Sequence, residues 1–166
     1  MVRIKYLVIA VLVVILGIWA ALHFFQSEER KVKKQFHLLS KWASKEAGEN
    51  TFTMAQKTRN IGKLFAEHCE LKADLISFSG RYTPEEISSY AASARFSFSN
   101  LSLQFYDFNV AFPEEGIARV TLTGKLKGRT TTGEDVDETH ELECALKKID
   151  NKWVFSYVEV VEALKK

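Results

Sequence analysis

The sequence lacks the short motifs that identify many enzymes. It has no glycine-rich phosphate loop, no nucleophile elbow and no zinc-protease helix motif. The 166 residues include only 2 prolines and no low-complexity run, which argues against a long disordered linker. The net charge is +2, from 23 basic and 21 acidic residues, so the chain has no broad basic surface for nucleic acid. We therefore expect no nucleic-acid partner.

Aromatic residues, by contrast, are plentiful. The chain has 12 Phe, 5 Tyr and 3 Trp, which is bulky material for a hydrophobic core. Its length suits one domain plus a short extra segment. A domain of about 140 residues buries roughly 68% of its unfolded surface, enough for a core of its own.

The extra segment is an uncharged apolar run at Tyr6–Phe25, preceded by a basic tail at residues 1–5. As a helix, the run is about 30 Å long, one hydrocarbon thickness. Trp19 lies toward one end, where aromatic rings favour the membrane interface. The run predicts a single transmembrane helix that contacts the lipid bilayer.

The same run has two interpretations, a cleaved signal peptide and an uncleaved anchor. Cleavage requires small residues in an A-x-A-like pattern. Here Ala20 and Ala21 are preceded by Trp19 and followed by the bulky Phe24 and Phe25. The run is also longer than a usual signal core, so the sequence favours the anchor.

Basic residues flank the run on both sides, and a simple count would place the C-terminal side in the cytoplasm. Long domains, however, translocate largely regardless of charge, and a basic tail before a first apolar run is the signal-anchor arrangement. We therefore expect a single-pass protein of a bacterial inner membrane. Its domain, residues 28–166, would lie outside the cytoplasm, in the periplasm of a Gram-negative cell.

Three helices are expected in the domain. The first, from about Glu28 to Ala47, has apolar residues at helical spacing. The second, from Thr53 to Leu71, begins with a capping-box spacing and carries Ile61, Leu64, Phe65 and His68 on one stripe. The third runs from Thr83, a predicted cap followed by proline and glutamate, to Phe96. A short strand, Asp74–Ser79, is expected between the second and third helices.

After the third helix the apolar period changes to two, which predicts four long strands. They cover about Leu101–Phe112, Ala118–Lys127, Val136–Leu146 and Trp153–Val161. The parity of the apolar residues switches within the first strand. This switch predicts a β-bulge near Phe105.

Charge predicts the register of the middle hairpin. A loop centred on Thr131 would place Arg119 opposite Glu143, Lys125 opposite Asp137 and Lys127 opposite Asp135. Such cross-strand pairs contribute roughly 0.2–1 kcal/mol each. One face would then be apolar and the other lined with ion pairs. The charged face is interpreted as a solvated sheet face, with a docking surface as the alternative.

The order of elements resembles the nuclear transport factor 2-like superfamily. The stretch Asp150-Asn151-Lys152-Trp153-Val154-Phe155 is similar to the final hairpin of that family. The resemblance implies an α+β cone, in which three N-terminal helices pack in the concave face of a curved antiparallel sheet. Here one transmembrane helix would precede the cone. The superfamily includes enzymes, transport adaptors and scaffolds, so the fold does not decide the function.

The resemblance also implies a pocket between the helices and the concave face. His140 shares parity with Leu142 and Cys144, so it points toward the apolar side, and Glu138 shares that parity. The two could form an acid–base pair. The alternative is a histidine satisfied by one hydrogen bond at the edge of the core.

Three further residues are candidates for lining this pocket: His68, Tyr106 and Tyr157. The family's isomerases use an aspartate base with a tyrosine and a second acid, and this chain does not match that set. Asp107 directly follows Tyr106, so the two point to opposite faces of a regular strand. No catalytic residue is therefore assigned.

The two cysteines, Cys69 and Cys144, have two interpretations. In an oxidising compartment they could form a disulfide, or each could be a small buried hydrophobe. With His68 and His140 they could also hold zinc, but the chain has no ligand spacing of the finger type. No metal or cofactor is expected.

The leading hypothesis is a non-enzymatic, membrane-tethered binding or scaffold domain. It would bind a second copy or another protein through the outer sheet face, and its cone could accept a small apolar ligand. One alternative is a small-molecule enzyme of the isomerase or cyclase kind. Another is a subunit of an envelope secretion or assembly complex, since the scaffold subunits of type IV secretion systems have a similar layout.

Overall fold

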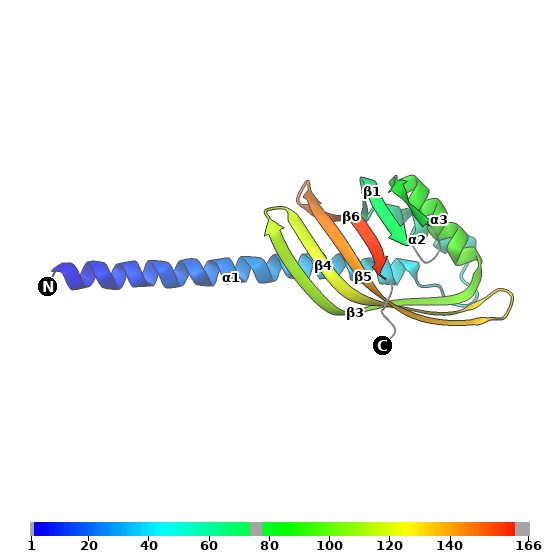
Figure 1. The fold of residues 1–166 in the computed structure, drawn as a ribbon, viewed down its shortest axis with the longest axis horizontal. Coiled ribbons are helices and arrows are strands. Elements are labelled where there is room, and N and C mark those ends of the chain that lie inside the picture. The colour runs from blue at the N-terminus through cyan, green and yellow to red at the C-terminus, as the bar shows by residue number, and fades with distance from the viewer. Residues whose placement is uncertain (1, 74–77, 162–166) are drawn as a thin grey trace. The chain divides into compact units, whose positions relative to one another are not determined.

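The computed structural model describes residues 2–73 and 78–161, with side chains described outside residues 2–11, 20–25 and 78. The chain divides into two compact units, residues 1–31 and 32–166. The helices and strands (Figure 1) are α1 (Val2–Ala43), α2 (Thr51–Gly62), β1 (Phe65–Ala73), β2 (Phe78–Tyr82), α3 (Pro84–Phe96), β3 (Phe98–Glu114), β4 (Ile117–Thr130), β5 (Asp135–Ile149) and β6 (Lys152–Val161).

The first expected helix is part of α1, which begins at Val2 and ends at Ala43. Among the residues that the structure describes, no helix is long and apolar enough to cross a membrane. Most side chains of the predicted span, Tyr6–Phe25, lie outside the described ones. The described side chains within it, residues 12–19, are all exposed.

The six strands form one sheet in the order β2-β1-β6-β5-β4-β3. All neighbours are antiparallel except β1 and β6, which are parallel, with Leu71 opposite Val158. The prediction of a purely antiparallel sheet is therefore wrong for the β1–β6 pair. Parallel neighbours need a long crossover, and here the whole stretch from β2 to β5 provides it.

The second expected helix is displaced at its start and wrong in its second half, because its cap is Asn50 rather than Thr53 and α2 begins at Thr51. Asn50 caps α2 by accepting a hydrogen bond from the Thr53 backbone N–H at 2.8 Å, and α2 ends at Gly62. The next residues form β1, whose register shifts between Phe65 and Glu70. Because of this irregularity the buried Ala66 and Cys69 lie three residues apart, a spacing that resembles a helix.

The third helix has the predicted boundaries and cap. The Glu86 backbone N–H donates to the Thr83 hydroxyl at 3.3 Å, and the Glu86 carboxylate accepts from the Thr83 backbone N–H at 2.8 Å. The expected strand at Asp74–Ser79 lies mostly outside the described residues. β2 begins at Phe78 and ends at Tyr82, three residues beyond the expected end at Ser79.

The four long strands follow the predicted alternation. The bulge in β3 lies between Tyr106 and Asn109, close to the predicted position, and Asp107 has a φ of 54° there. Asp150 and Asn151 both have positive φ, 47° and 64°. This is the geometry of a tight hairpin turn that matches the twist of its strands.

The predicted register of the β4–β5 hairpin is offset from the observed one. Lys127 lies opposite Asp137, Lys125 opposite Thr139 and Arg119 opposite Ala145. The hairpin is thus centred on Thr132, and each residue meets a partner two positions further along. A shift of two preserves the face on which every side chain lies, so the apolar and charged faces are as predicted.

Candidate functional site

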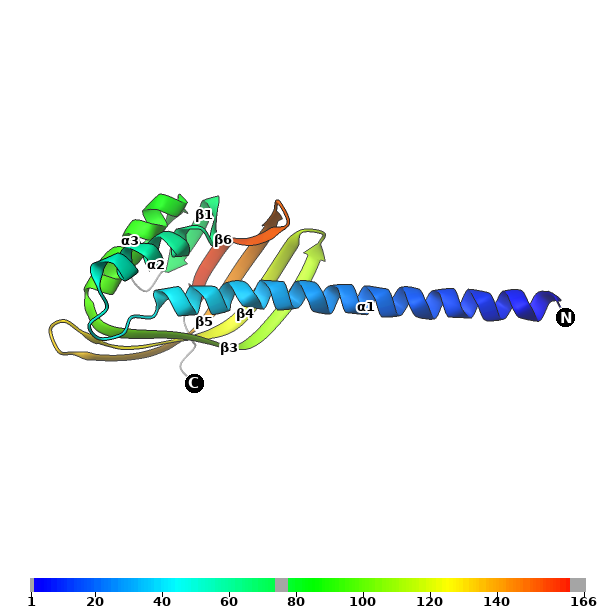
Figure 2. The same cartoon turned by 180° about the vertical axis from the view of Figure 1, so that it is seen from behind.

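Part of the concave face of the sheet is covered by aromatic side chains packed around Phe36. Phe36 of α1 is 1% exposed. Its ring meets those of Phe105, Phe108 and Phe155 edge to face, with centroids 5.5, 5.3 and 4.9 Å away. Figure 2 shows the domain's part of α1 lying across the inner side of β4 and β5. At Phe36, side chains therefore occupy the position where the resemblance implies a pocket.

The predicted pair of His140 and Glu138 does form. The His140 Nε2 lies 3.3 Å from the Glu138 carboxylate, and the two side chains are 31% and 61% exposed. Both lie on β5 with the parity of Leu142. The pair therefore sits at the margin of the inner face, as expected of a histidine at the edge of the core.

The other three predicted pocket residues do not join this pair. His68 is exposed on β1 rather than on a helical stripe. Tyr106 is 44% exposed and donates to the Gln104 side chain on the same strand. The register also shifts between β5 and β6, so Ala145 faces Tyr157 while Leu146 faces Phe155. The extra residue turns Tyr157 to the outer face, where its hydroxyl contacts Glu159.

Both cysteines are free thiols buried in the core, so the disulfide is not formed. β6 lies between β1 and β5, which places Cys69 and Cys144 two strand spacings apart. That is about 9.5 Å between strand axes, beyond the roughly 7 Å between Cα atoms that a bridge allows. Burial raises the pKa of the Cys69 thiol to about 12, and burial likewise raises the pKa of the Cys144 thiol.

Among the described residues, no group of three or more His, Cys, Asp or Glu side chains could hold a metal ion. The conceivable zinc set therefore has no geometric support, since His68 points to solvent and the two cysteines lie apart. Asp107 lies at the bulge and accepts a hydrogen bond from the Thr123 hydroxyl at 3.3 Å. It thus shares the outer face with Thr123 rather than the inner face.

Sequence reasoning missed Arg95, the largest fully buried side chain among the described residues. Its guanidinium donates to the backbone carbonyls of Trp42, Ala43 and Ser44 at the end of α1, at 2.7, 2.5 and 2.8 Å, and pairs with the Glu49 carboxylate. Lys57 of α2 also pairs with Glu49, at 2.5 Å. The only sequence signal was a basic residue in the last turn of a helix.

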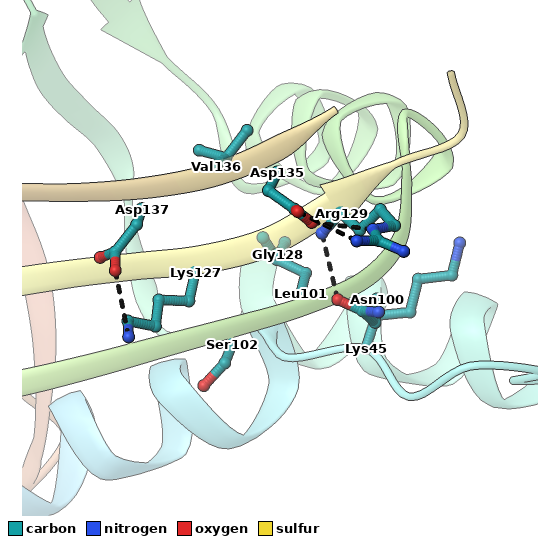
Figure 3. A pocket seen from close by; sticks show the side chains of 10 residues that line it. All are labelled: Lys45, Asn100, Leu101, Ser102, Lys127, Gly128, Arg129, Asp135, Val136 and Asp137. Atoms are coloured by element: carbon teal, nitrogen blue, oxygen red, sulfur yellow. Dashed lines mark hydrogen bonds and ion pairs between the residues drawn. The ribbon is translucent and has the colours of Figure 1, made fainter. Parts of the chain in front are cut away.

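The tip of the β4–β5 hairpin borders a polar depression of about 520 Å³ (Figure 3). Four of its charged side chains are paired with one another, and a fifth, Lys45, donates to the backbone carbonyls of Arg95 and Phe98. Arg129 holds both carboxylate oxygens of Asp135, at 2.8 and 3.0 Å, and Lys127 lies 3.0 Å from Asp137. These hydrogen bonds lower the pKa of each aspartate. The ion pairs account for the charges of Lys127, Arg129, Asp135 and Asp137 at the hairpin tip.

The outer face between β4 and β6 differs, because its charges are unmatched. A groove of about 350 Å³ is lined by Asp107, Glu141 and Glu143 together with threonines of β4. Glu143 lies opposite Glu159 across the ladder, a like-charge pair that is unfavourable. Arg119, on β4, faces Ala145 instead of the predicted Glu143. Within the described part of the chain, neither Arg119 nor Glu143 has an ion-pair partner.

The sheet order, the bulged strand and the helix across the concave face form an α+β cone, the fold that the resemblance noted above implies. Solved structures share it. A proposed scytalone dehydratase from Novosphingobium aromaticivorans is 18% identical, with 84% of this chain and 86% of that chain covered and a TM-score of 0.66. A protein from Kribbella flavida is 7% identical, with 85% and 94% covered and a TM-score of 0.70.

A third solved structure with this fold is the hexachlorocyclohexane dehydrochlorinase LinA type 2. It is 9% identical, with 82% of this chain and 85% of that chain covered and a TM-score of 0.67. No family model matches the sequence, and no curated protein matches it. Identities this low show a shared fold and say nothing of activity.

Proposed function

We propose that this chain is a non-enzymatic, membrane-tethered binding or scaffold domain that docks through its outer sheet face. The observation that carries the proposal is the unmatched charge on that face. Arg119 and Glu143 are predicted by charge to pair with each other, yet the observed register separates them. Exposed charges of both signs on one face suit electrostatic recognition of another protein surface.

The interior of the cone supports the same reading. Phe36 and its three aromatic neighbours pack together on the concave face, so side chains occupy this part of the cone. An acid–base mechanism needs its groups within hydrogen-bond reach of one another. His140 has Glu138 as its neighbour, whereas Tyr106 and Tyr157 lie elsewhere.

A second copy of the chain is the simplest partner. A two-fold axis that runs parallel to β4 and β5, midway between them, would lay β4 of each copy over β5 of the other. In that arrangement Arg119 of each copy lies over Ala145 of its partner, between Lys147 and Glu143, and its long side chain would turn toward Glu143. Such an isologous interface makes each contact twice.

Charge reversal tests this docking in the full chain, by sedimentation velocity in mild detergent. Arg119→Glu and Glu143→Arg should each weaken self-association several-fold, because each removes two contacts and creates two repulsions. An equal mixture of the two variants should restore association, because each substituted residue then faces a residue of opposite charge in the other variant. Arg59→Glu, on the exposed side of α2, is the control. Variants that associate like the wild-type chain, or a wild-type chain that stays monomeric, would refute docking to a second copy.

The tether is part of the proposal. Tyr6–Phe25 would cross the membrane, with residues 1–5 in the cytoplasm and the domain outside it. The exposure of the described side chains in this run supports the assignment: Val13, Leu16 and Trp19 are 63%, 61% and 65% exposed. A continuous exposed apolar surface of this kind marks a membrane or protein contact. Resistance of the chain to carbonate extraction from membranes would test it.

A second candidate function is a small-molecule enzyme of the isomerase or cyclase kind. Two observations favour it: the contact of His140 with Glu138, and a fold shared with LinA and a proposed scytalone dehydratase. In that case His140→Ala should abolish turnover without changing stability. Co-purification of partner proteins in mild detergent would instead favour the third candidate, a subunit of an envelope secretion or assembly complex.

A further inference from the structure

One edge of the sheet, β3, is partly covered by the end of α1. The Lys45 backbone N–H donates to the Leu101 carbonyl at 2.7 Å, and the Leu101 N–H donates to the Lys45 carbonyl at 2.9 Å. The Leu103 N–H donates to the Ser44 hydroxyl at 3.1 Å, and the Ser40 hydroxyl donates to the Leu103 carbonyl at 2.5 Å. The chain thus satisfies the outward backbone groups at these two positions.

The next outward position on this edge is Phe105. In an antiparallel pair, alternate residues direct their backbone groups toward the partner strand and away from it. Leu101 and Leu103 point away from β4, so Phe105 does as well. Among the described residues, none bonds to the backbone N–H or carbonyl of Phe105. An open sheet edge of this kind is a template for an added strand.

A groove of about 370 Å³ runs along this open edge, between α1 and β3. We call it the α1–β3 groove; it is lined by Lys33, His37, Ser40, Gln104, Phe105, Tyr106 and Phe108. Lys33 and His37 lie one helical turn apart on α1, and the Lys33 ammonium sits 5.8 Å from the centre of the Phe108 ring. One wall therefore presents a lysine and a histidine, and the other offers aromatic surface.

We propose that the α1–β3 groove binds an extended segment of another protein, which adds to β3 at Phe105 and places an acidic side chain beside Lys33 and His37. Strand addition supplies affinity through main-chain hydrogen bonds, and flanking side chains supply specificity. The bulge between Tyr106 and Asn109 interrupts the regular alternation of β3, so the added segment is short. A second copy pairing through β3 would bring its own Lys33 into the groove, and like charges oppose that arrangement.

Fluorescence anisotropy on the full chain in mild detergent tests the charge preference. The probe is a short labelled peptide of alternating threonine and valine with one central glutamate, compared with the same peptide carrying lysine. The glutamate peptide should bind about fivefold more tightly, the size of one exposed ion pair. Lys33→Glu should reverse the order. Lys34 is one residue away and outside the groove, so Lys34→Glu should leave the preference for the glutamate peptide unchanged.

Amide hydrogen exchange tests the strand addition. The Phe105 amide should exchange fast in the free chain and slow down when the glutamate peptide binds, whereas the Gln104 amide, already paired toward β4, should not change. The proposal is overturned if neither peptide binds saturably, if both bind equally, or if the Phe105 amide stays unprotected. Protection that grows with protein concentration in the absence of peptide would also overturn it, in favour of a second copy.

Discussion

At the scale of single residues, the Arg95 side chain joins three segments of the domain. It caps the last carbonyls of α1, where a positive charge complements the helix dipole, and it pairs with Glu49 ahead of α2. Burial tends to raise the pKa of Glu49, but hydrogen bonds from Lys57 and Arg95 outweigh it and hold that pKa below 4.5. The ends of α1 and α3 therefore depend on one buried charge network.

Replacing Arg95 by methionine should destabilise the full chain by about 3–5 kcal/mol, because removing one partner leaves buried polar groups without their counterpart. Arg59→Met, an exposed arginine on α2, is the matched control and should stay within about 0.5 kcal/mol of the wild-type chain. Urea unfolding followed by tryptophan fluorescence measures both. A loss of less than about 1 kcal/mol for Arg95→Met would mean that the network is not important for stability.

The buried thiols predict a loss of stability at alkaline pH. The ordinary thiol pKa is 9.0, whereas that of folded Cys69 is about 12. Above pH 9 the unfolded chain loses these protons and the folded chain keeps them, so the free energy of unfolding falls as pH rises. Between about pH 8 and pH 10 the wild-type chain should lose roughly 1–3 kcal/mol more than a variant with Cys69→Ala and Cys144→Ala. Equal losses would contradict this account.

Residue parity predicted some site residues well and could not predict others. His140 and Glu138 share a strand, so counting by two was enough to place them together. Tyr157 was misplaced because one extra residue in β6, between the partners of Ala145 and Leu146, reverses the parity. Arg95 was missed because its burial depends on backbone carbonyls of α1, far away in sequence.

At the scale of elements, α2 and α3 pack closely at Gly62. A Cβ atom added there would lie 2.5 Å from the Pro84 carbonyl oxygen. That oxygen belongs to the backbone at the start of α3, so it has little freedom to move. The close approach of the two helices thus requires the absence of a side chain at this position.

Gly62→Ala should therefore destabilise the chain by about 1–3 kcal/mol, through overpacking. Helix propensity acts in the opposite direction, since alanine is favoured over glycine by about 1 kcal/mol. Gly17→Ala, in α1, is the matched control, because nothing lies within 4 Å of the added atom. Thermal unfolding compares the two, and a neutral or stabilising effect at Gly62 would show that the helices can separate without cost.

Elements defined by local signals were predicted best. The cap at Thr83 and the positive-φ turn at Asp150 act over a few residues, and both were found where expected. β1 was mistaken for a helix because its strand character depends on pairing with β6, where Leu71 meets Val158. The predicted register of the β4–β5 hairpin was wrong by two residues. It was inferred from exposed ion pairs, and pairs of about 0.2–1 kcal/mol are too weak to determine a register.

At the scale of the whole molecule, the inner and outer faces of the sheet differ in composition. The inner face packs aliphatic and aromatic side chains into the core. On the outer face, Arg119 of β4 and Glu143 of β5 have no ion-pair partner among the described residues. This division favours a domain that acts by contact with other proteins over one that encloses a substrate, although its fold also occurs in enzymes.

Native mass spectrometry of the full chain, released from detergent micelles without reducing agent, tests this account most directly. It resolves the number of copies and any bound small molecule in one experiment. The account predicts a dimer or a larger complex that carries no small molecule. A monomer that retains a small molecule would contradict it, because the cone would then hold a ligand and the outer face would have no partner.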